Sequence, residues 1–400
     1  MKIITRTVWV LSLVSLFTDV ASEMLYPVMP IYLKEIGFSI LLIGILEGVA
    51  EATAGLSKSY FGKLSDVSGK RLPFVRVGYL LSAISKPMMA VFIYPLWIFI
   101  SRTIDRFGKG IRTGARDAML SDEATPETKG QVFGLHRAMD TLGAVIGPAF
   151  ALLYLYLFPG NYKSLFFIAF IPGIVAISFT FFIKDKKREA KKIELKAASF
   201  FSFAQYWKES TLAYKKLVAG LLAFTLINSS DVFLLLKVKE AGLDDTTVIG
   251  VYIFYNLIYA IAAYPLGKLS DRIGFKKTLI FGFIVFAVVY FGMATSHELY
   301  QFMILFFLYG IYAAATESVA KAWISNISDK KDTATAIGTY TGFQSVFTMI
   351  ASSFAGWIWL VFGASATFLI SSGATLLIVI YIIIVAQNNK PETSSSLKET

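Results

Sequence analysis

The sequence reads Gly62-Lys-Leu-Ser-Asp-Val-Ser-Gly-Lys-Arg71 in its first half and Gly267-Lys-Leu-Ser-Asp-Arg-Ile-Gly-Phe-Lys-Lys277 in its second. The copies begin at residues 62 and 267, an offset of 205 residues. The same offset relates Lys34-Glu-Ile-Gly37 to Lys239-Glu-Ala-Gly242. A repeat at half-chain spacing indicates two similar structural units in one chain. We therefore expect two halves in parallel orientation, with any solute site at their interface near the membrane midplane.

Composition places both halves in a membrane. Of the 400 residues, 56% are hydrophobic and 16% are charged, and the mean hydropathy is +0.63. Soluble domains have roughly 45–50% apolar and about 25% charged residues. The excess is gathered in apolar stretches of roughly the 20 residues that a spanning helix needs. Because lipid offers no hydrogen bonds to the backbone, we predict an all-α membrane protein.

The apolar stretches predict twelve transmembrane helices, six in each pseudo-symmetric half. The expected spans are residues 8–33, 40–61, 72–94, 96–120, 130–157, 163–183, 216–238, 247–266, 278–294, 300–324, 333–360 and 364–386. The expected domains are a six-helix bundle (1–184), a linker (185–215), a second bundle (216–386) and a tail (387–400). The first span exceeds the roughly 7–15 apolar residues of a signal peptide, so we expect a mature helix there.

The basic residues predict the orientation. On one side the loops between spans contain Lys63, Lys70, Arg71, Lys129, Lys268, Arg272, Lys276, Lys277, Lys330 and Lys331, and the linker adds more. The other side has little beyond Lys34, Lys163, Lys237 and Lys239. Cytoplasmic loops are rich in Lys and Arg. Both termini are therefore expected in the cytoplasm of a bacterial inner membrane, and the net charge of +11 indicates topology, not a nucleic-acid partner.

The linker is polar and lacks Pro and Gly. We expect part of it to form an amphipathic helix on the membrane surface, with its aromatic side chains in the interface. These aromatic residues are Phe200, Phe201, Phe203 and Trp207.

The repeated stretch resembles the loop between helices 2 and 3 of the major facilitator superfamily (MFS), Gly-x-Leu-(small)-Asp-(Arg)-x-Gly-(Arg)-(Lys/Arg). The resemblance implies the twelve-helix fold, secondary transport, and a gating loop that stabilises the outward-facing state. The residues that match are Gly62, Asp66, Gly69, Lys70, Arg71, Gly267, Asp271 and Gly274. Independently, an aspartate in this place can accept from the N-terminal N–H groups of an adjacent helix. The alternative is a tight turn without a gating role.

Two further stretches, residues 18–27 and 105–117, resemble a poorly characterised prokaryotic group of that superfamily. This resemblance implies no particular substrate. A third, Gly143-x-x-x-Gly147-Pro148, resembles part of the antiporter signature of drug exporters. It can equally be explained as helix packing through small residues next to a proline kink.

The expected fourth span carries an unusual number of bases. Arg102, Arg106, Lys109, Arg112 and Arg116 fall in one sector of the helix roughly 120° wide. From first to last they cover about 21 Å of helix. Bases inside a membrane are costly and mark pathways. We therefore predict an anionic or zwitterionic organic solute, with a static network of ion pairs as the alternative.

The predicted substrate-binding residues are Arg102, Arg106, Lys109, Arg137, Tyr252, Asn256, Tyr340 and Gln344. Three carboxylates inside expected spans, Asp19, Glu23 and Glu51, are the predicted proton carriers. No nucleotide-binding loop of the GxxxxGK(S/T) type occurs, which argues against an ATP-driven pump.

With two histidines, no cysteine and no nucleophile motif, we expect no catalytic residue, metal or cofactor. The predicted function is secondary transport of a small solute across the inner membrane by alternating access, coupled to protons. We expect a monomer in the lipid bilayer. The alternatives are a proton-coupled multidrug exporter and a sensor or scaffold that transports nothing.

Overall fold

The computed structural model describes residues 4–26, 28–38, 40–186 and 202–385. Throughout that part of the chain the regular elements are helices, without a strand. The first half contains α1 (Arg6–Leu25), α2 (Met29–Glu35), α3 (Ile40–Ser68), α4 (Leu72–Val91), α5 (Pro95–Asp122), α6 (Lys129–Leu157) and α7 (Tyr162–Thr180). After α8 (Ser202–Glu209), the second half contains α9 (Leu212–Ile227), α10 (Val232–Glu240), α11 (Asp245–Ile273), α12 (Phe275–Met293), α13 (Leu299–Ile327), the short 3-10 helix η2 (Lys330–Asp332), α14 (Thr333–Phe362) and α15 (Ala364–Val385).

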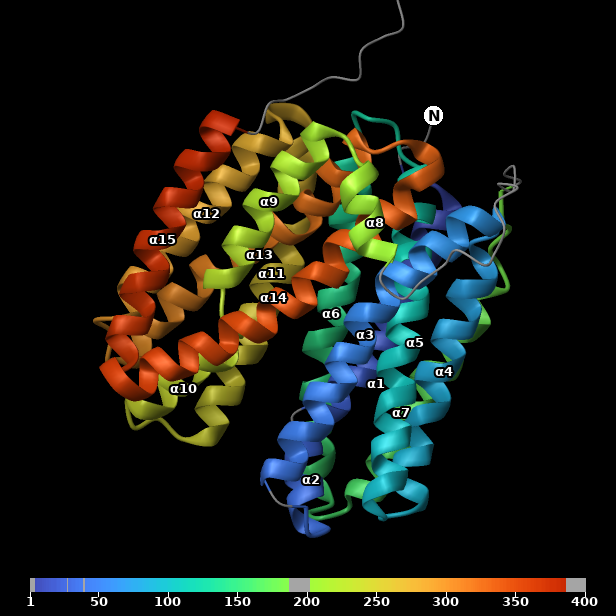
Figure 1. Cartoon of the computed structure of the whole chain (residues 1–400). Coiled ribbons are helices and arrows are strands. Elements are labelled where there is room, and N and C mark those ends of the chain that lie inside the picture. Colours follow the sequence, from blue (N-terminus) through green and yellow to red (C-terminus); the bar gives the residue numbers. More distant parts are fainter. Residues whose placement is uncertain (1–3, 27, 39, 187–201, 386–400) are drawn as a thin grey trace, which may run out of the picture.

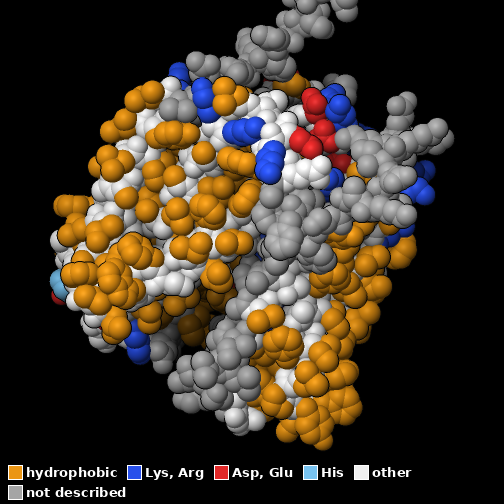
Figure 2. Space-filling model, in the orientation of Figure 1, with side chains coloured by type: hydrophobic (Ala, Val, Ile, Leu, Met, Phe, Trp, Pro, Cys, Tyr) orange, Lys and Arg blue, Asp and Glu red, His pale blue; other side chains and the backbone are white. Residues whose placement is uncertain are grey.

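The helices form two bundles, α1–α7 and α9–α15, that lie side by side (Figure 1). Within the described residues, ten helical segments are long and apolar enough to cross a membrane, with α9 and α10 counted together as one. The helices α3 and α5, of 29 and 28 residues, are just as long but contain more charged residues. Apolar side chains cover the outer sides of both bundles (Figure 2). The chain is therefore a multi-pass membrane protein, and the predicted all-α fold is confirmed.

The first span of each half is broken, and the prediction of continuous helices at 8–33 and 216–238 is wrong in this respect. In the first half α1 ends at Leu25 and α2 begins at Met29. The sequence has Pro27 in between, and proline removes a helical hydrogen bond. In the second half Asn-Ser-Ser-Asp (228–231) separates α9 from α10. Such short polar side chains bond to nearby backbone and favour turns.

The two halves touch at the end of the molecule where the α3–α4 and α11–α12 loops lie, which we call the closed end. There α3 packs on α14, and α6 packs on α11. A Cβ on Gly62 would lie 2.6 Å from the carbonyl oxygen of Ala334, and one on Gly267 would lie 2.2 Å from that of Gly130. Only glycine allows backbones this close. Away from the closed end the halves diverge, and the surface between them is hollowed (Figure 2).

The short helix α8 crosses the closed end and contacts both halves. Lys63 of α3 donates to Gln205 at 3.0 Å, and the ring of Trp207 packs 6.0 Å from that of Phe343 on α14. Trp207 thus contacts protein, whereas the sequence pattern predicts the membrane interface for it. The side chains of Phe200, Phe201 and Phe203 and the tail 387–400 lie outside the described residues.

Candidate functional site

A cavity of about 370 Å³ lies between the halves, at the inner end of the hollow. Side chains from both bundles line it. They are Asp19, Ser22, Glu23, Lys58, Ser82, Asp105, Arg106, Lys109, Arg112, Thr113, Arg116, Arg137, Asp140, Thr141, Ala144, Asp231, Tyr252, Tyr255, Asn256, Tyr259, Glu317, Lys321, Thr341 and Gln344. Seven of these are basic and six are acidic, so the cavity can contact both signs of charge.

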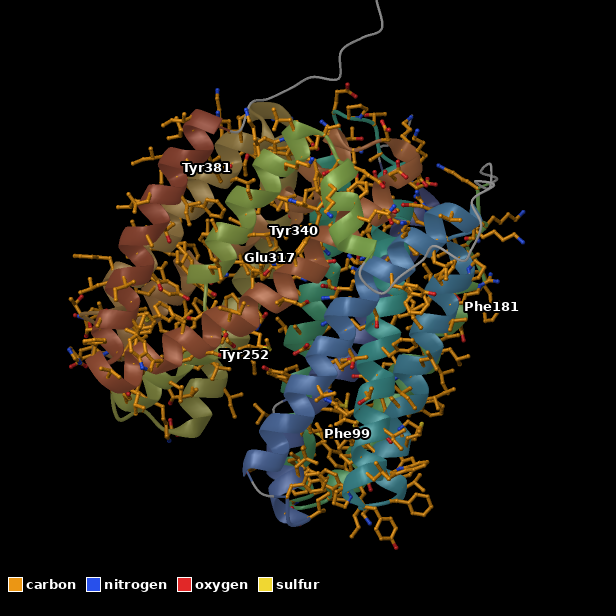
Figure 3. All side chains as sticks on the ribbon, in the orientation of Figure 1. Phe99, Phe181, Tyr252, Glu317, Tyr340 and Tyr381 are labelled. Atoms are coloured by element: carbon orange, nitrogen blue, oxygen red, sulfur yellow. The ribbon has the colours of Figure 1, made fainter. Side chains whose placement is uncertain are left out.

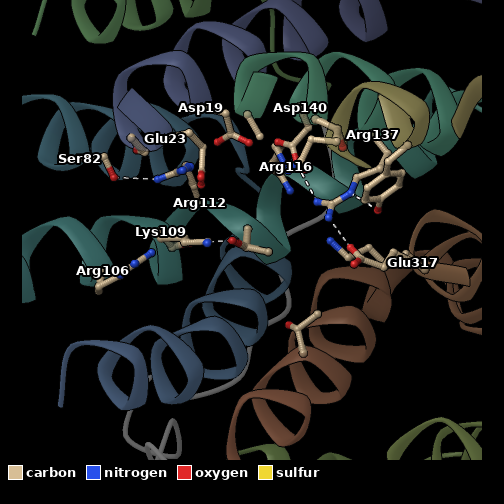
Figure 4. A pocket seen from close by; sticks show the side chains of 18 of the residues that line it. Asp19, Glu23, Ser82, Arg106, Lys109, Arg112, Arg116, Arg137, Asp140 and Glu317 are labelled. Carbon is tan, nitrogen blue, oxygen red and sulfur yellow. Dashed lines mark hydrogen bonds and ion pairs between the residues drawn. The ribbon is translucent and has the colours of Figure 1, made fainter. Parts of the chain in front are cut away.

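The helix α5 forms a basic wall of this central cavity (Figure 4). Arg106, Lys109 and Arg112 all reach the cavity because they follow one another at helical spacing. Arg112 donates to the Ser82 hydroxyl at 2.7 Å, and its guanidinium lies 4.5 Å from the ring centre of Tyr79. Neither the hydroxyl nor the ring carries a negative charge, so these two contacts position the guanidinium without neutralising it. Its positive charge can therefore act on the cavity.

Carboxylates of α1 and α6 lie next to this basic wall. Asp19 and Glu23 are four residues apart on α1, so they share one face. The charged neighbours of Asp19 are Asp140, Glu23 and Lys109. Asp140 accepts from the Ser15 hydroxyl at 2.5 Å. Carboxylates and a lysine thus lie together at one place in the cavity, where binding of a proton or of a charged solute would change the net charge of the cluster.

Two charge contacts join the halves on the closed side of the cavity. Arg137 of α6 pairs with Asp140 at 2.7 Å and also binds Glu317 of α13. Lys321, one turn further along α13, pairs with Asp117 of α5 at 2.8 Å. Because the contacts made by Glu317 and Lys321 connect opposite halves, both must break before the closed end can open.

The second half lines the opposite wall with tyrosines of α11. Tyr252, Tyr255 and Tyr259 recur at helical spacing and all reach the cavity. Asp231, at the break between α9 and α10, accepts from the hydroxyls of Tyr255 at 3.3 Å and Tyr309 at 2.6 Å. A carboxylate framed by phenols can contact a cationic group, and the ring faces can contact apolar groups.

Most of the predicted substrate-binding residues line the central cavity, with two exceptions. Arg102 is buried inside the first half, where it contacts Asp105 at 3.5 Å, and Asp105 also pairs with Lys86 at 2.6 Å. Tyr340 instead lines a smaller cavity of about 50 Å³ inside the second half, and Gln344 lines both cavities. Among the predicted proton carriers, Asp19 and Glu23 line the central cavity, and the side chain of Glu51 lies outside the described residues.

Several lining residues were not predicted as site residues. Lys58, Asp231, Glu317 and Lys321 are examples. Each is a charged residue in or next to an apolar span, which is the signal that could have identified it. Lys58 reaches across the interface and donates to the Ser345 hydroxyl of α14 at 3.2 Å.

The repeated loops contact helix N-termini of the opposite half. The carboxylate of Asp66 accepts from the backbone N–H of Thr335 at 2.7 Å and from its hydroxyl at 2.8 Å. That of Asp271 accepts from the N–H groups of Gly130 and Gln131, each at 2.7 Å. These are the first turns of α14 and α6, where a negative charge is favourable.

The first copy contains an additional buried arginine. Arg71 bonds to Asp66 at 3.1 Å, to Asp122 at 2.5 Å and to the carbonyl oxygen of Lys330. Lys70 beside it is exposed. In both copies the second glycine has a positive φ, +68° at Gly69 and +96° at Gly274.

Comparison with known proteins agrees with this architecture. The family model described as Major Facilitator Superfamily matches residues 11–255 and 232–400. An uncharacterised MFS-type transporter of Methanocaldococcus jannaschii is 32% identical over 92% of both chains. A multi-drug resistance efflux pump homologue of Lactococcus lactis is 21% identical over 79% of this chain and 78% of its own.

Two solved transporters share the fold at low sequence identity. The human organic anion transporter MFSD10 has a TM-score of 0.79 at 17% identity, covering 94% of this chain and 99% of its own. The fucose:proton symporter FucP of Escherichia coli has a TM-score of 0.79 at 13% identity, covering 96% and 100%. A second FucP structure, in the outward conformation, has a TM-score of 0.76 at 12% identity, covering 97% and 100%.

Proposed function

Since the chain belongs to the Major Facilitator Superfamily, a family of transporters and not of enzymes, we propose that it moves a small anionic or zwitterionic organic solute by alternating access. The observation that carries the proposal is the basic wall of the central cavity. Arg106, Lys109 and Arg112 reach a cavity of about 370 Å³, which lies within the range of small-molecule sites. A guanidinium or ammonium group there can form charge-assisted hydrogen bonds to a carboxylate or phosphate.

The opposite wall extends the proposal to zwitterions. Asp231 and the tyrosines of α11 face the basic wall across the cavity and can receive a cationic group. We retain six of the predicted substrate-binding residues as contacts in the central cavity, whereas Arg102 pairs with Asp105 inside the first half and Tyr340 lines the smaller cavity of the second half. MFSD10, an organic anion transporter of the same fold, supports the same substrate class. The retained residues are Arg106, Lys109, Arg137, Tyr252, Asn256 and Gln344.

We also propose proton coupling through Asp19 and Glu23. Both carboxylates line the cavity, and Lys109 is a charged neighbour of each. A proton that neutralises either carboxylate would remove one of the two negative charges that attract Lys109, which would then bind an anionic solute more tightly. The fucose:proton symporter of the same fold supports this coupling.

The proposed orientation follows from the closed end, which contains the basic loops. Placing those loops in the cytoplasm, by the positive-inside rule, makes the hollow open to the outside. A FucP structure of the same fold, in the outward conformation, supports this state. We therefore propose a single-chain carrier of the bacterial inner membrane, composed of residues 1–184 and 216–386, with both termini cytoplasmic and Asp66 and Asp271 as gating residues.

The decisive experiment combines binding and stability. Purified protein is screened by thermal shift and calorimetry against carboxylates, phosphate esters, amino acids and cationic drugs. Lys109→Gln should weaken binding of an anion by about 1.5–3 kcal/mol, the strength of a charge-assisted hydrogen bond, or about 10- to 150-fold in Kd. Lys163→Gln, on an exposed lysine outside the cavity, is the matched control.

A static ion-pair network predicts a different result. Lys109→Gln would then lower Tm without changing affinity, and adding Asp19→Asn or Glu23→Gln would restore Tm. A double-mutant cycle on both quantities separates the two explanations. Binding that prefers cationic drugs and survives Lys109→Gln would favour the multidrug exporter suggested by the Lactococcus relative. Ligand binding without flux into vesicles would favour a sensor.

A further inference from the structure

The smaller cavity of the second half lies directly beside the central one. It has a volume of about 50 Å³, and Glu317 and Gln344 line both cavities. Figure 3 locates Glu317 and Tyr340 close together within the second bundle, on the closed side of Tyr252. Residues of α9, α12, α13 and α14 surround this smaller cavity, which we call the side pocket. Its remaining lining residues are Leu221, Phe224, Thr225, Asn228, Leu279, Phe283, Tyr312, Thr316, Ala320 and Tyr340.

Four of the twelve residues that line the side pocket are aromatic, namely Phe224, Phe283, Tyr312 and Tyr340. The rings of Phe224 and Phe283 stack at a centroid distance of 4.1 Å, and Tyr312 lies 5.9 Å from Phe224. Leu221, on the same face of α9 as Phe224, adds an aliphatic contact. Ring faces and edges in such an arrangement favour another flat apolar group.

Three of the hydroxyl and amide donors around the side pocket have protein partners. Thr225 donates to the carbonyl oxygen of Leu221 at 2.9 Å, and Thr316 donates to that of Tyr312 at 2.9 Å. The amide of Asn228 donates to the Tyr312 hydroxyl at 3.0 Å. These three donors are bonded to protein, whereas the Oδ1 of Asn228 is buried without a partner among the described residues and can accept a hydrogen bond from a polar group on the ring of a bound molecule.

The size of the side pocket limits what it can hold. A water molecule needs roughly 10–15 Å³ of such space and a cavity that binds benzene has roughly 150 Å³, so about 50 Å³ admits only part of a ring, and the rest of the ring would lie in the central cavity. Because the side pocket adjoins the central cavity at Glu317 and Gln344, one molecule can occupy both. Its charged end would then lie at the basic wall of α5 and its apolar end among the rings.

From this geometry we propose that the side pocket is the subsite for an aromatic substituent of the substrate, which makes the substrate an aryl-substituted organic acid or amino acid. The inference rests on the proposed function, because the charged end of such a molecule needs the basic wall. On this proposal Phe224, Phe283 and Tyr340 of the second half decide which organic anions the protein binds.

The test compares probe pairs that differ by one phenyl group. Binding of acetate and phenylacetate, and of alanine and phenylalanine, is measured by calorimetry on the purified full chain. The phenyl group should tighten binding roughly tenfold or more. Ala320→Leu fills the side pocket and should abolish that gain while leaving acetate binding unchanged. Ile304→Phe, which adds bulk to the exposed face of the same helix, is the control and should leave the gain intact.

A second variant covers the case in which Ala320→Leu fails to fold. Leu279→Ala enlarges the side pocket and should increase the affinity for naphthylacetate relative to phenylacetate. If acetate binds but the phenyl group adds nothing, the subsite is refuted and the anion carrier stands. If benzylamine binds as phenylacetate does and no carboxylate is preferred, the anion carrier is refuted. In that case the response to Ala320→Leu still decides whether the subsite exists.

Discussion

Replacing Asp66 with asparagine tests whether the repeated loop holds the closed end together. The residue is 8% exposed, and its carboxylate accepts three hydrogen bonds. Two come from Thr335 of the opposite half and one from Arg71. Asparagine has nearly the same shape and retains one acceptor oxygen, but it loses the charge that favours the N-terminus of α14.

The magnitude follows from these contacts. Hydrogen bonds to charged groups contribute about 1.5–3 kcal/mol each. Since one acceptor remains and Arg71 keeps Asp122, we expect a net loss of about 2–3 kcal/mol. The ratio of closed to open molecules should fall about 30- to 150-fold. Asp271→Asn should have a smaller effect, because that carboxylate accepts two backbone bonds, whereas Asp66 also binds a buried arginine.

The chain has no cysteine, so a spin-label pair at Thr125→Cys and Lys331→Cys reports the distance across the closed end. Asp66→Asn should broaden this distance toward longer values without lowering helix content. Glu209→Gln, a charge removal on the exposed face of α8, serves as the control. Unchanged distances and full transport in Asp66→Asn would refute the gating role.

Two further predictions follow from the packing and the charge distribution. Gly267→Ala would bring a Cβ to 2.2 Å from the carbonyl oxygen of Gly130, and relieving this clash requires the backbone to move. We expect the closed end to lose about 1–3 kcal/mol of stability, which the spin labels would report as a longer distance. Gly373→Ala is the control, because the space around Gly373 is open and the label distance should not change. For topology, His297→Cys should react with an impermeant maleimide in intact cells and Thr125→Cys only after the cells are opened; the opposite pattern would reverse the orientation.

The sequence alone determined the fold class and its two halves, but it did not show that the first span of each half is broken. Hydropathy located the spans, and the repeated stretch related the two halves, because both signals are local and survive without tertiary contacts. The role of the repeated aspartate could also be predicted from the sequence. An aspartate at that place needs a donor group, and the N-terminus of an adjacent helix supplies one. The structure identifies the helices as α14 and α6, one from each half.

The composition of the cavity required the tertiary structure. Helical spacing placed Arg102, Arg106 and Lys109 in one sector, yet Arg102 contacts Asp105 inside the first half while the other two reach the cavity. Periodicity states which residues share a face, but not which neighbour that face meets along its length. For the same reason, the sequence could not predict the pair that Arg137 and Glu317 form between the two halves. Long charged side chains pair with the oppositely charged groups that lie nearest in space, and only the packing of the two bundles determines which groups those are.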